Sequence, residues 1–217
     1  IGIPTTLSEL LMSASQMLLN NFASAHGDGF LAAIGIAWTV VMVPSMLVMG
    51  LSQGIQPLIG YTYAAKLHGR LREVLKFTLI TATLFGIFMG VVIFVFGSGA
   101  VALFIKDAVV VEFGQRIVRL LVWSMPFLGV QFVLSTVFQS LGKARQTLVL
   151  SIARQGIVFI PILMLFNYTL GRDGLILAQP VSDLLSMLLT VLLFLPVRRE
   201  LAGANITREN RRARLGD

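Results

Sequence analysis

The stretch Gln53-Gly-Ile-Gln-Pro-Leu-Ile-Gly-Tyr61 closes a long apolar run that begins near Phe30. Two glutamines, a proline and two glycines are unfavourable inside a bilayer, where an amide needs a partner and the carbonyl freed by proline must be satisfied nearby. We therefore expect this helix to face protein or a water-filled cavity, and to do more than cross the membrane.

Six residues of this helix fall on one face, because they are spaced by steps of three and four. They are Met42, Met46, Met49, Gln53, Gln56 and Gly60. Methionine side chains adapt to varied ligands, so methionines beside two amides indicate a wall that contacts amphipathic molecules. The predicted substrate-binding residues on this face are Met46, Met49, Gln53 and Gln56. A packing face between two helices explains the same stripe equally well.

The composition excludes an ordinary soluble domain. Of 217 residues, 56% are hydrophobic and 12% are charged, which is typical of a polytopic membrane protein. With no cysteine, the chain has no disulfide and no thiolate metal site. Six segments reach the apolar length of about 20 residues that a spanning helix needs: 3–25, 30–63, 74–97, 109–141, 147–170 and 174–197. We expect an all-α bundle of six transmembrane helices over 1–201 and a basic tail over 202–217.

Basic residues mark one side of this bundle. Twelve of the 17 lysines and arginines lie in the segments 66–76, 143–145 and 198–214, whereas Lys106 and Arg172 lie in the opposite links. Cytoplasmic links carry such an excess, so we expect a multi-pass cell-membrane protein with both ends of this chain cytoplasmic. The formal charge of +7 then indicates contact with membrane lipids and no nucleic-acid partner. The chain opens directly into an apolar segment, so we expect no signal peptide and part of a longer protein.

A second polar stripe lies on the predicted helix 3–25. Glu9, Ser13, Gln16 and Asn20 are spaced by four, three and four residues and share one face, which a lipid-facing helix does not tolerate. We predict that Gln16 and Asn20 bind substrate. Glu9 is an ionisable group within a span and a candidate for ion coupling, by carrying a proton or binding Na⁺. Its place near the cytoplasmic end leaves open that it simply reaches water.

Three further candidates lie in the last three predicted helices. Gln131, on a polar face of 109–141, is predicted to bind substrate. Arg154 needs a carboxylate partner within the membrane, and Glu9 and Asp183 are the acids that the spans offer. Asp183 is the most deeply placed acid of the chain. We predict that it either couples an ion or neutralises Arg154 in a structural ion pair, and the sequence leaves both open.

Small residues in the third predicted helix indicate a packing role instead of a binding role. Ala82, Gly86 and Gly90 are spaced by four, the pattern with which membrane helices approach each other closely. The rest of that helix after Thr78 is almost wholly apolar. We therefore expect it to be peripheral and to line no cavity.

Several motifs together resemble a known family. They are the stretch from Gln53 to Tyr61, the stretch Phe138-Gln-Ser-Leu-Gly-Lys-Ala-Arg145, the stretch Gln179-Pro-Val-Ser-Asp183, and Pro4 shortly before Glu9. In order and spacing they resemble the second six-helix half of the multidrug and toxic compound extrusion (MATE) transporters. The resemblance extends to about Leu201.

This resemblance implies two six-helix lobes related by a pseudo-two-fold axis, with this chain as the C-terminal lobe and the N-terminal lobe as its missing partner. It implies efflux of organic cations or amphipathic drugs by antiport against Na⁺ or H⁺, with no other cofactor, no metal and no enzymatic activity. Many members carry an acid in the seventh helix, which Glu9 resembles. Others carry one in the middle of the tenth, where this chain has Ser124 and Gln131, so the coupling acid could also lie in the missing lobe.

Other functions fit the sequence less well. A lipid-linked glycan flippase of related architecture would need several deep cationic side chains, and Arg154 alone is deep here. A polytopic membrane enzyme would need His, Cys or paired acids at one depth, and the chain has no phosphate loop or nucleophile elbow. A scaffold or passive channel remains open on sequence alone.

Overall fold

The computed structural model describes residues 2–105 and 107–215, and of residues 2–5, 68, 98, 144, 151 and 198–215 it describes the backbone alone. The side chains of the predicted basic tail, 202–217, therefore lie outside the described part. The helices are α1 (Gly2–Ser24), α2 (Asp28–Gly54), α3 (Gln56–Ala64), α4 (His68–Phe104), α5 (Ala108–Leu121), α6 (Met125–Ser140), α7 (Ala144–Ile152), α8 (Phe159–Leu170) and α9 (Arg172–Leu215).

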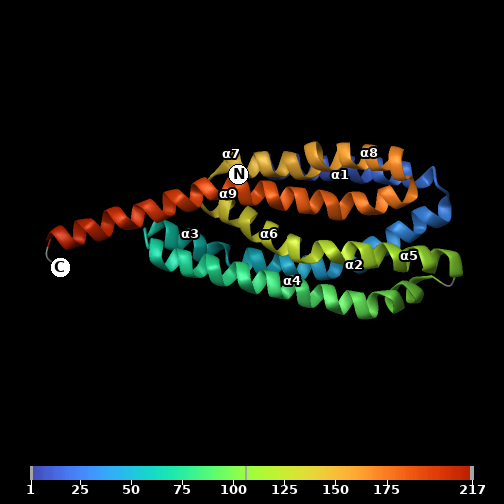
Figure 1. The fold of residues 1–217 in the computed structure, drawn as a ribbon, viewed down its shortest axis with the longest axis horizontal. Helices are drawn as coiled ribbons and strands as arrows, with labels where there is room; N and C mark the ends of the chain where they lie inside the picture. The colour runs from blue at the N-terminus through green and yellow to red at the C-terminus, as the bar shows by residue number, and fades with distance from the viewer. Residues whose placement is uncertain (1, 106, 216–217) are drawn as a thin grey trace.

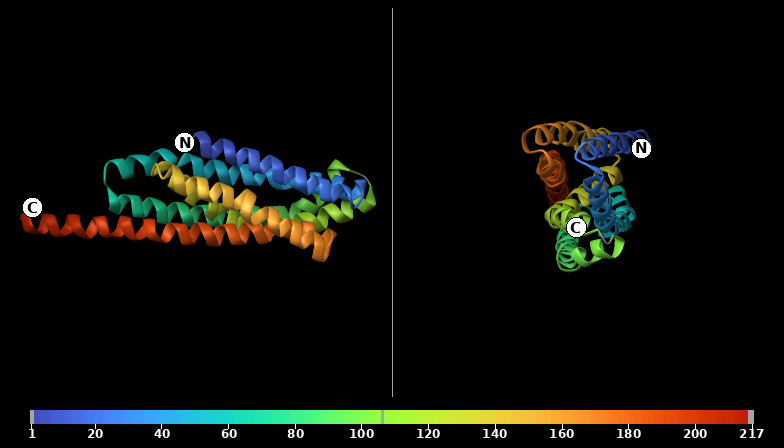
Figure 2. Two further views of the ribbon diagram at one scale, coloured as in Figure 1. Left: turned by 90° about the horizontal axis from the view of Figure 1, so that it is seen from above. Right: turned by 90° about the vertical axis from the view of Figure 1, so that its right-hand side faces the viewer.

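The expected all-α membrane bundle is confirmed. Five stretches of described residues are helical, long and apolar enough to cross a membrane: Asp28–Ala64, Gly69–Gly97, Ala108–Ser140, Arg145–Leu170 and Arg172–Val197. Before them comes α1, whose 23 residues span roughly 35 Å at about 1.5 Å per residue. The helices run lengthwise along the bundle, and the start of α1 and the end of α9 point to the same end (Figures 1 and 2).

Short irregular turns interrupt three of the long rods. The break between α2 and α3 falls at Ile55, and Pro57 occupies the second position of α3, where its missing N–H matters little. A 3₁₀ turn, η1 (Val122–Ser124), precedes Pro126 at the start of α6. A π-helical turn, η2 (Ala153–Val158), separates α7 from α8. Pro57 and Pro126 thus lie at interruptions within long rods, whereas Gly27, Gly142 and Gly171, each with positive φ, lie in the turns where helices end.

The rods pack mainly in pairs. α4 lies along α6, α8 along α9, α2 along α5, and α1 along α7. Seen end-on, α1 and α8 lie together on one side of the bundle, and α4 lies on the far side (Figure 2, right). A Cβ added at Gly86 would lie 2.8 Å from the carbonyl oxygen of Met125 on α6, so the predicted close approach of the small residues of α4 is confirmed.

A valine at Gly86 is expected to destabilise the lobe by about 1–3 kcal/mol or more, because the facing backbone of α6 cannot give way as a side chain can. Gly99→Val on the same helix is the matched control, since nothing lies within 4 Å of a Cβ placed at Gly99. Thermal unfolding in detergent measures the difference. Equal midpoints for the two variants would show that α4 and α6 are not in close contact.

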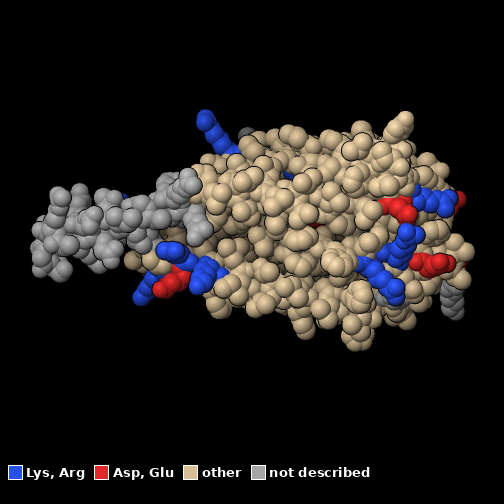
Figure 3. Space-filling view, in the orientation of Figure 1, with Lys and Arg blue, Asp and Glu red and all other residues tan. Residues whose placement is uncertain are grey.

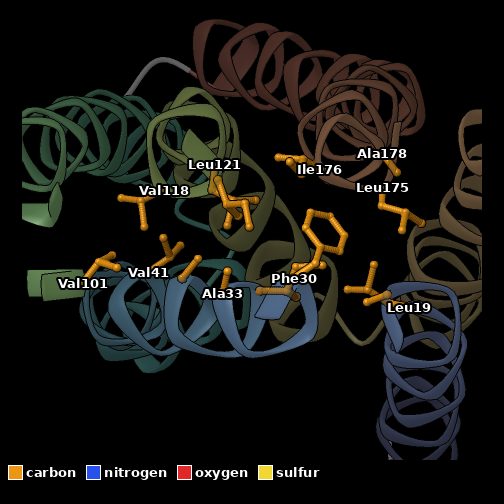
Figure 4. Close-up of a cluster of buried hydrophobic side chains, with 14 of the residues drawn as sticks. Leu19, Phe30, Ala33, Val41, Val101, Val118, Leu121, Leu175, Ile176 and Ala178 are labelled. Carbon is orange, nitrogen blue, oxygen red and sulfur yellow. The ribbon is translucent and has the colours of Figure 1, made fainter. Parts of the chain in front are cut away.

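Two apolar clusters fill the interior. The first joins α1, α2, α4, α5, α6, α8 and α9, and in it the ring of Phe30 points toward Leu175 and Ile176 (Figure 4). The second joins α3, α4, α6, α7 and the later part of α9, around Phe138 and Leu71. Each buries large side chains almost completely. Because both clusters are apolar, the polar residues found between them are the exception that calls for a function or a partner.

Exposed charge is confined to the two ends of the bundle. On the face drawn in Figure 3, lysine, arginine, aspartate and glutamate gather at both ends, and the broad middle is nearly free of them. Large apolar side chains of α4, among them Leu84, Phe88 and Val95, are exposed. An apolar belt between two charged ends is what a hydrocarbon core of about 30 Å requires.

Candidate functional site

A layer of buried polar residues separates the two apolar clusters. We call it the polar layer, and its members are Gln131, Arg154, Gln179, Ser182, Asp183 and Ser186. On α6 Gln131 lies between Leu128 of the first cluster and Val133 of the second, and Arg154 lies likewise between Phe159 and Leu150. Four of its members are nearly inaccessible: Gln131, Ser182, Asp183 and Ser186 are each 2–3% exposed. Hydrophilic groups at this depth are unfavourable unless they bind one another or a ligand.

The centre of the polar layer is an ion pair. Nη2 of Arg154 lies 3.8 Å from Oδ1 of Asp183, and the amide of Gln179 donates to Oδ2 of Asp183 at 3.2 Å. The guanidinium also lies over the ring of Phe132, 5.2 Å from its centre. The Asp183 side chain is 2% exposed and that of Arg154 is 24% exposed. The carboxylate is therefore enclosed by the protein, whereas part of the arginine side chain reaches the surface of the lobe. The sequence predicts both acids as partners for Arg154, and the structure places Asp183 there.

Arg154 is carried by the π-helical turn η2. A π turn leaves the regular hydrogen-bond pattern, and such turns are frequent at functional sites. The hydroxyl of Ser15 on α1 donates to the carbonyl oxygen of Gln155 at 2.6 Å, and Leu11 packs against Gly156 one turn earlier. This contact ties η2 to the helix that carries Glu9. The sequence gives no signal of it beyond the small size of Ser15.

Three buried oxygens of the polar layer have no hydrogen-bond partner among the described residues: Oε1 of Gln131 and the hydroxyls of Ser182 and Ser186. Other buried hydroxyls in this chain donate to the carbonyl one turn earlier, as Thr190 does to Ser186 at 2.6 Å and Ser52 does to Val48 at 3.0 Å. Ser182 and Ser186, which lie near Asp183 in the sequence, do not make this hydrogen bond. Gln131, predicted to bind substrate, thus lies inside the lobe and not on its surface.

The predicted binding stripes lie on the outside of this lobe. On α2, Met42, Met46 and Met49 are 51%, 56% and 41% exposed, and Gln53 is exposed beside the half-buried Gln56. They lie opposite the buried face of α2, which runs from Phe30 to Ser52. Neither their role nor their convergence on one chamber follows from this lobe alone.

The stripe of α1 is placed in the same way. Glu9, Ser13 and Asn20 are exposed and Gln16 is half-buried, whereas Ser15 and Leu19 pack inward. Because both stripes turn away from the lobe's own core, a shared chamber has to lie between this lobe and something outside it. Their role in binding stays a prediction.

The end of the bundle farthest from the ends of the chain is held together by polar contacts. Nη2 of Arg172 donates to the carbonyl oxygen of His26 at 3.0 Å, and Nε2 of His26 lies 3.3 Å from Oδ1 of Asn167. Arg116 pairs with Asp173 at 3.2 Å. These contacts join the α1–α2 link to α8 and α9, and α5 to α9.

A small crevice opens beside the polar layer. It is lined by eight apolar residues, among them Trp38, Ile34 and Phe159, and by Gln179. Gln179 therefore bridges the crevice and Asp183. The crevice is apolar on every other side, so it offers a single polar contact next to the buried carboxylate.

Comparison with known proteins identifies a family and several relatives of this chain. The family model described as MatE matches residues 4–165. The chain is 30% identical over 197 residues to the multidrug export protein MepA of Staphylococcus aureus, covering 89% of this chain and 43% of that protein, and 28% identical to MepA of Staphylococcus saprophyticus over the same shares. The chain thus spans less than half the length of the relatives it matches.

Solved structures show the same fold. An outward-facing multidrug resistance MATE family transporter of the MOP superfamily superposes with a TM-score of 0.84 at 21% identity, covering 94% of this chain and 46% of that one. The bent form of the Vibrio cholerae MATE transporter VcmN superposes with a TM-score of 0.83 at 21% identity, with the same coverage.

Proposed function

This chain belongs to the MatE family, and from that premise we propose that it is one six-helix lobe of a multidrug exporter that works by antiport. A second lobe of six helices is its partner, and drugs pass between the two by alternating access. The proposal is supported by the 43% of MepA that the chain spans and by MepA's description as a multidrug export protein. Transport, and no enzymatic chemistry, is then the activity.

One observation carries the proposal: Asn20 of α1 and Met46, Met49 and Gln53 of α2 are exposed on long apolar helices, away from the packing faces, with Gln16 and Gln56 half-buried beside them. Lipid tails do not satisfy an amide such as Gln53 or Asn20. A water-filled chamber against a second lobe does. Flexible methionines then contact varied organic cations and amphipathic drugs, and Gln16, Asn20, Gln53 and Gln56 give them hydrogen bonds.

The coupling ion is Na⁺ or H⁺, held by a carboxylate. Glu9 lies exposed on the α1 stripe and Asp183 lies in the polar layer, so each is a candidate for this role. A cationic drug and a coupling ion compete for one negative charge, which is how binding of the ion releases the drug. Gln131 contributes from within the lobe, by positioning and not by direct contact, because it is 3% exposed.

Both ends of the lobe lie in the cytoplasm under this proposal. It is supported by a basic cluster near the end of the bundle where α9 finishes, made of Lys66 in the link after α3 and of Arg70, Arg72 and Lys76 in the first turns of α4. The outer end is then the one held by Arg172 and His26. Anionic lipids contact the basic side.

The test is active transport by the complete exporter in sealed vesicles. With an imposed Na⁺ or H⁺ gradient, a cationic dye is expected to accumulate against its own gradient, and collapse of that gradient with an ionophore is expected to stop accumulation. Separate Na⁺ and H⁺ gradients identify the ion. Dye movement that only ever runs downhill, whatever ion gradient is imposed, would show a passive channel and end the proposal.

A further inference from the structure

The polar layer holds more oxygen acceptors than its own donors satisfy. Besides the Asp183 carboxylate, Oε1 of Gln131 and the hydroxyls of Ser182 and Ser186 are buried without a partner among the described residues. Leaving such groups unpaired away from water is unfavourable, because each loses its hydrogen bonds to solvent. Carboxylate, amide and hydroxyl oxygens are the ligand types that hard cations take, so the polar layer offers ligands of suitable chemistry to a small cation.

The cation already there is bound loosely. The separation of 3.8 Å between Arg154 and Asp183 is longer than the 2.7–2.9 Å typical of a charge-assisted hydrogen bond. The guanidinium also lies over the Phe132 ring, and a quarter of its side chain is exposed. If it leaves the carboxylate, the ring remains as a favourable contact for its charge.

Other charges do not compete at Asp183. Among the described residues α6 and α8 carry no charged side chain, and η2 carries Arg154 alone. The charged side chains described on α1, α4, α5 and α7 are all exposed: Glu9, Arg70, Arg72, Glu73, Lys76, Glu112, Arg116, Arg119 and Arg145. Arg154 and an entering cation are therefore the two groups that compete for the Asp183 carboxylate.

The turn that carries Arg154 also interrupts the regular hydrogen-bond pattern of a long membrane-spanning rod. Sites for coupling ions in transporters form where membrane helices are interrupted near mid-depth, and η2 is such an interruption. The hydrogen bond from Ser15 to the carbonyl of Gln155 carries any shift of η2 into α1.

We propose that a small monovalent cation, H⁺ or Na⁺, displaces Arg154 from Asp183, and that η2 then shifts and pulls α1 through Ser15. Cation binding at Asp183 stands on this lobe alone, whereas its consequence for transport rests on the proposed function. In this proposal Arg154 occupies the Asp183 carboxylate as a cation of the protein itself until a free ion displaces it.

The test is cation binding by the purified exporter, read from the infrared C=O band of a protonated carboxyl group. In one arm the pH is lowered without Na⁺, and in the other NaCl replaces choline chloride at fixed pH. We expect a band, or a carboxylate shift with Na⁺, that is lost in Asp183→Asn and kept in Glu73→Gln, which removes an exposed acid of α4. Arg154→Gln is expected to lower the half-saturating cation concentration at least about tenfold, since a unit charge about 4 Å away is removed.

Each outcome either supports or overturns the proposed cation site. A response in Asp183→Asn equal to that of the unsubstituted protein overturns the proposal, and so does an unchanged half-saturation in Arg154→Gln. If either single variant does not fold, the charge-free pair Arg154→Gln with Asp183→Asn restores neutrality and is expected to fold without the response. Absence of dye transport together with an intact Asp183 response would refute the proposed function and leave the cation site standing.

Discussion

Replacing Arg154 by leucine is expected to destabilise the protein by about 3–5 kcal/mol at high pH without Na⁺, because the substitution leaves a buried carboxylate unpaired. Asp183 is 2% exposed, and the partners that remain, Gln179 and Ser124, are neutral and do not balance its charge. The midpoint of thermal unfolding in detergent measures the loss. Acid or added Na⁺ is expected to recover part of it, because each supplies the cation that the site lacks.

The matched control is Arg119→Leu, which removes an exposed arginine and is expected to change stability by less than about 1 kcal/mol. The double variant Arg154→Leu with Asp183→Leu removes both charges and is expected to regain most of the stability, since apolar replacements of buried pairs are often neutral. A double variant as unstable as the single one would mean that the two side chains do not act as a pair.

Replacing Glu9 by glutamine is expected to reduce ion-driven efflux about 5- to 150-fold, the range that a coupling free energy of about 1–3 kcal/mol gives. Glutamine keeps the size and the hydrogen bonds of the side chain and removes its charge. Downhill exchange of dye is expected to persist, because the chamber and its methionines are unchanged. Dye accumulation in sealed vesicles, driven and undriven, separates the two.

Glu73→Gln serves as the control, since Glu73 is an exposed acid on α4, a helix that we expect to line no cavity. If ion-driven efflux in Glu9→Gln equals that of Glu73→Gln, Glu9 takes no part in coupling. Asp183 or an acid of the second lobe would then carry the ion.

The features that depend on periodicity and on charge count could be predicted from the sequence. Steps of three and four place Met46 and Gln53 on one face whatever that face contacts, and the scarcity of acids makes Asp183 a partner for Arg154. The four-residue spacing of Ala82, Gly86 and Gly90 likewise predicts a close contact, which the approach of α6 to α4 shows.

Features that depend on which helix lies beside which could not be predicted. The π-helical turn η2, the bond from Ser15 to Gln155 and the place of Arg154 over Phe132 all join segments far apart in sequence. Gln131 shows the limit most clearly. Its polarity indicates a wet face, but its neighbours on α9 bury it in the polar layer, and no local pattern distinguishes the two.

Labelling of single cysteines tests most directly whether α1 and α2 line a chamber that contains water. This chain has no cysteine, so Gln53→Cys and Asn20→Cys each give one reactive site in it, and Phe88→Cys on the exposed apolar face of α4 is the control. The experiment uses the complete exporter, with any cysteine of the other lobe removed. A charged thiol reagent is expected to label Gln53→Cys and Asn20→Cys rapidly, and an excess of drug is expected to slow this labelling. Phe88→Cys is expected to react slowly or not at all. Equal resistance at all three positions would place the two stripes against lipid and contradict the exporter.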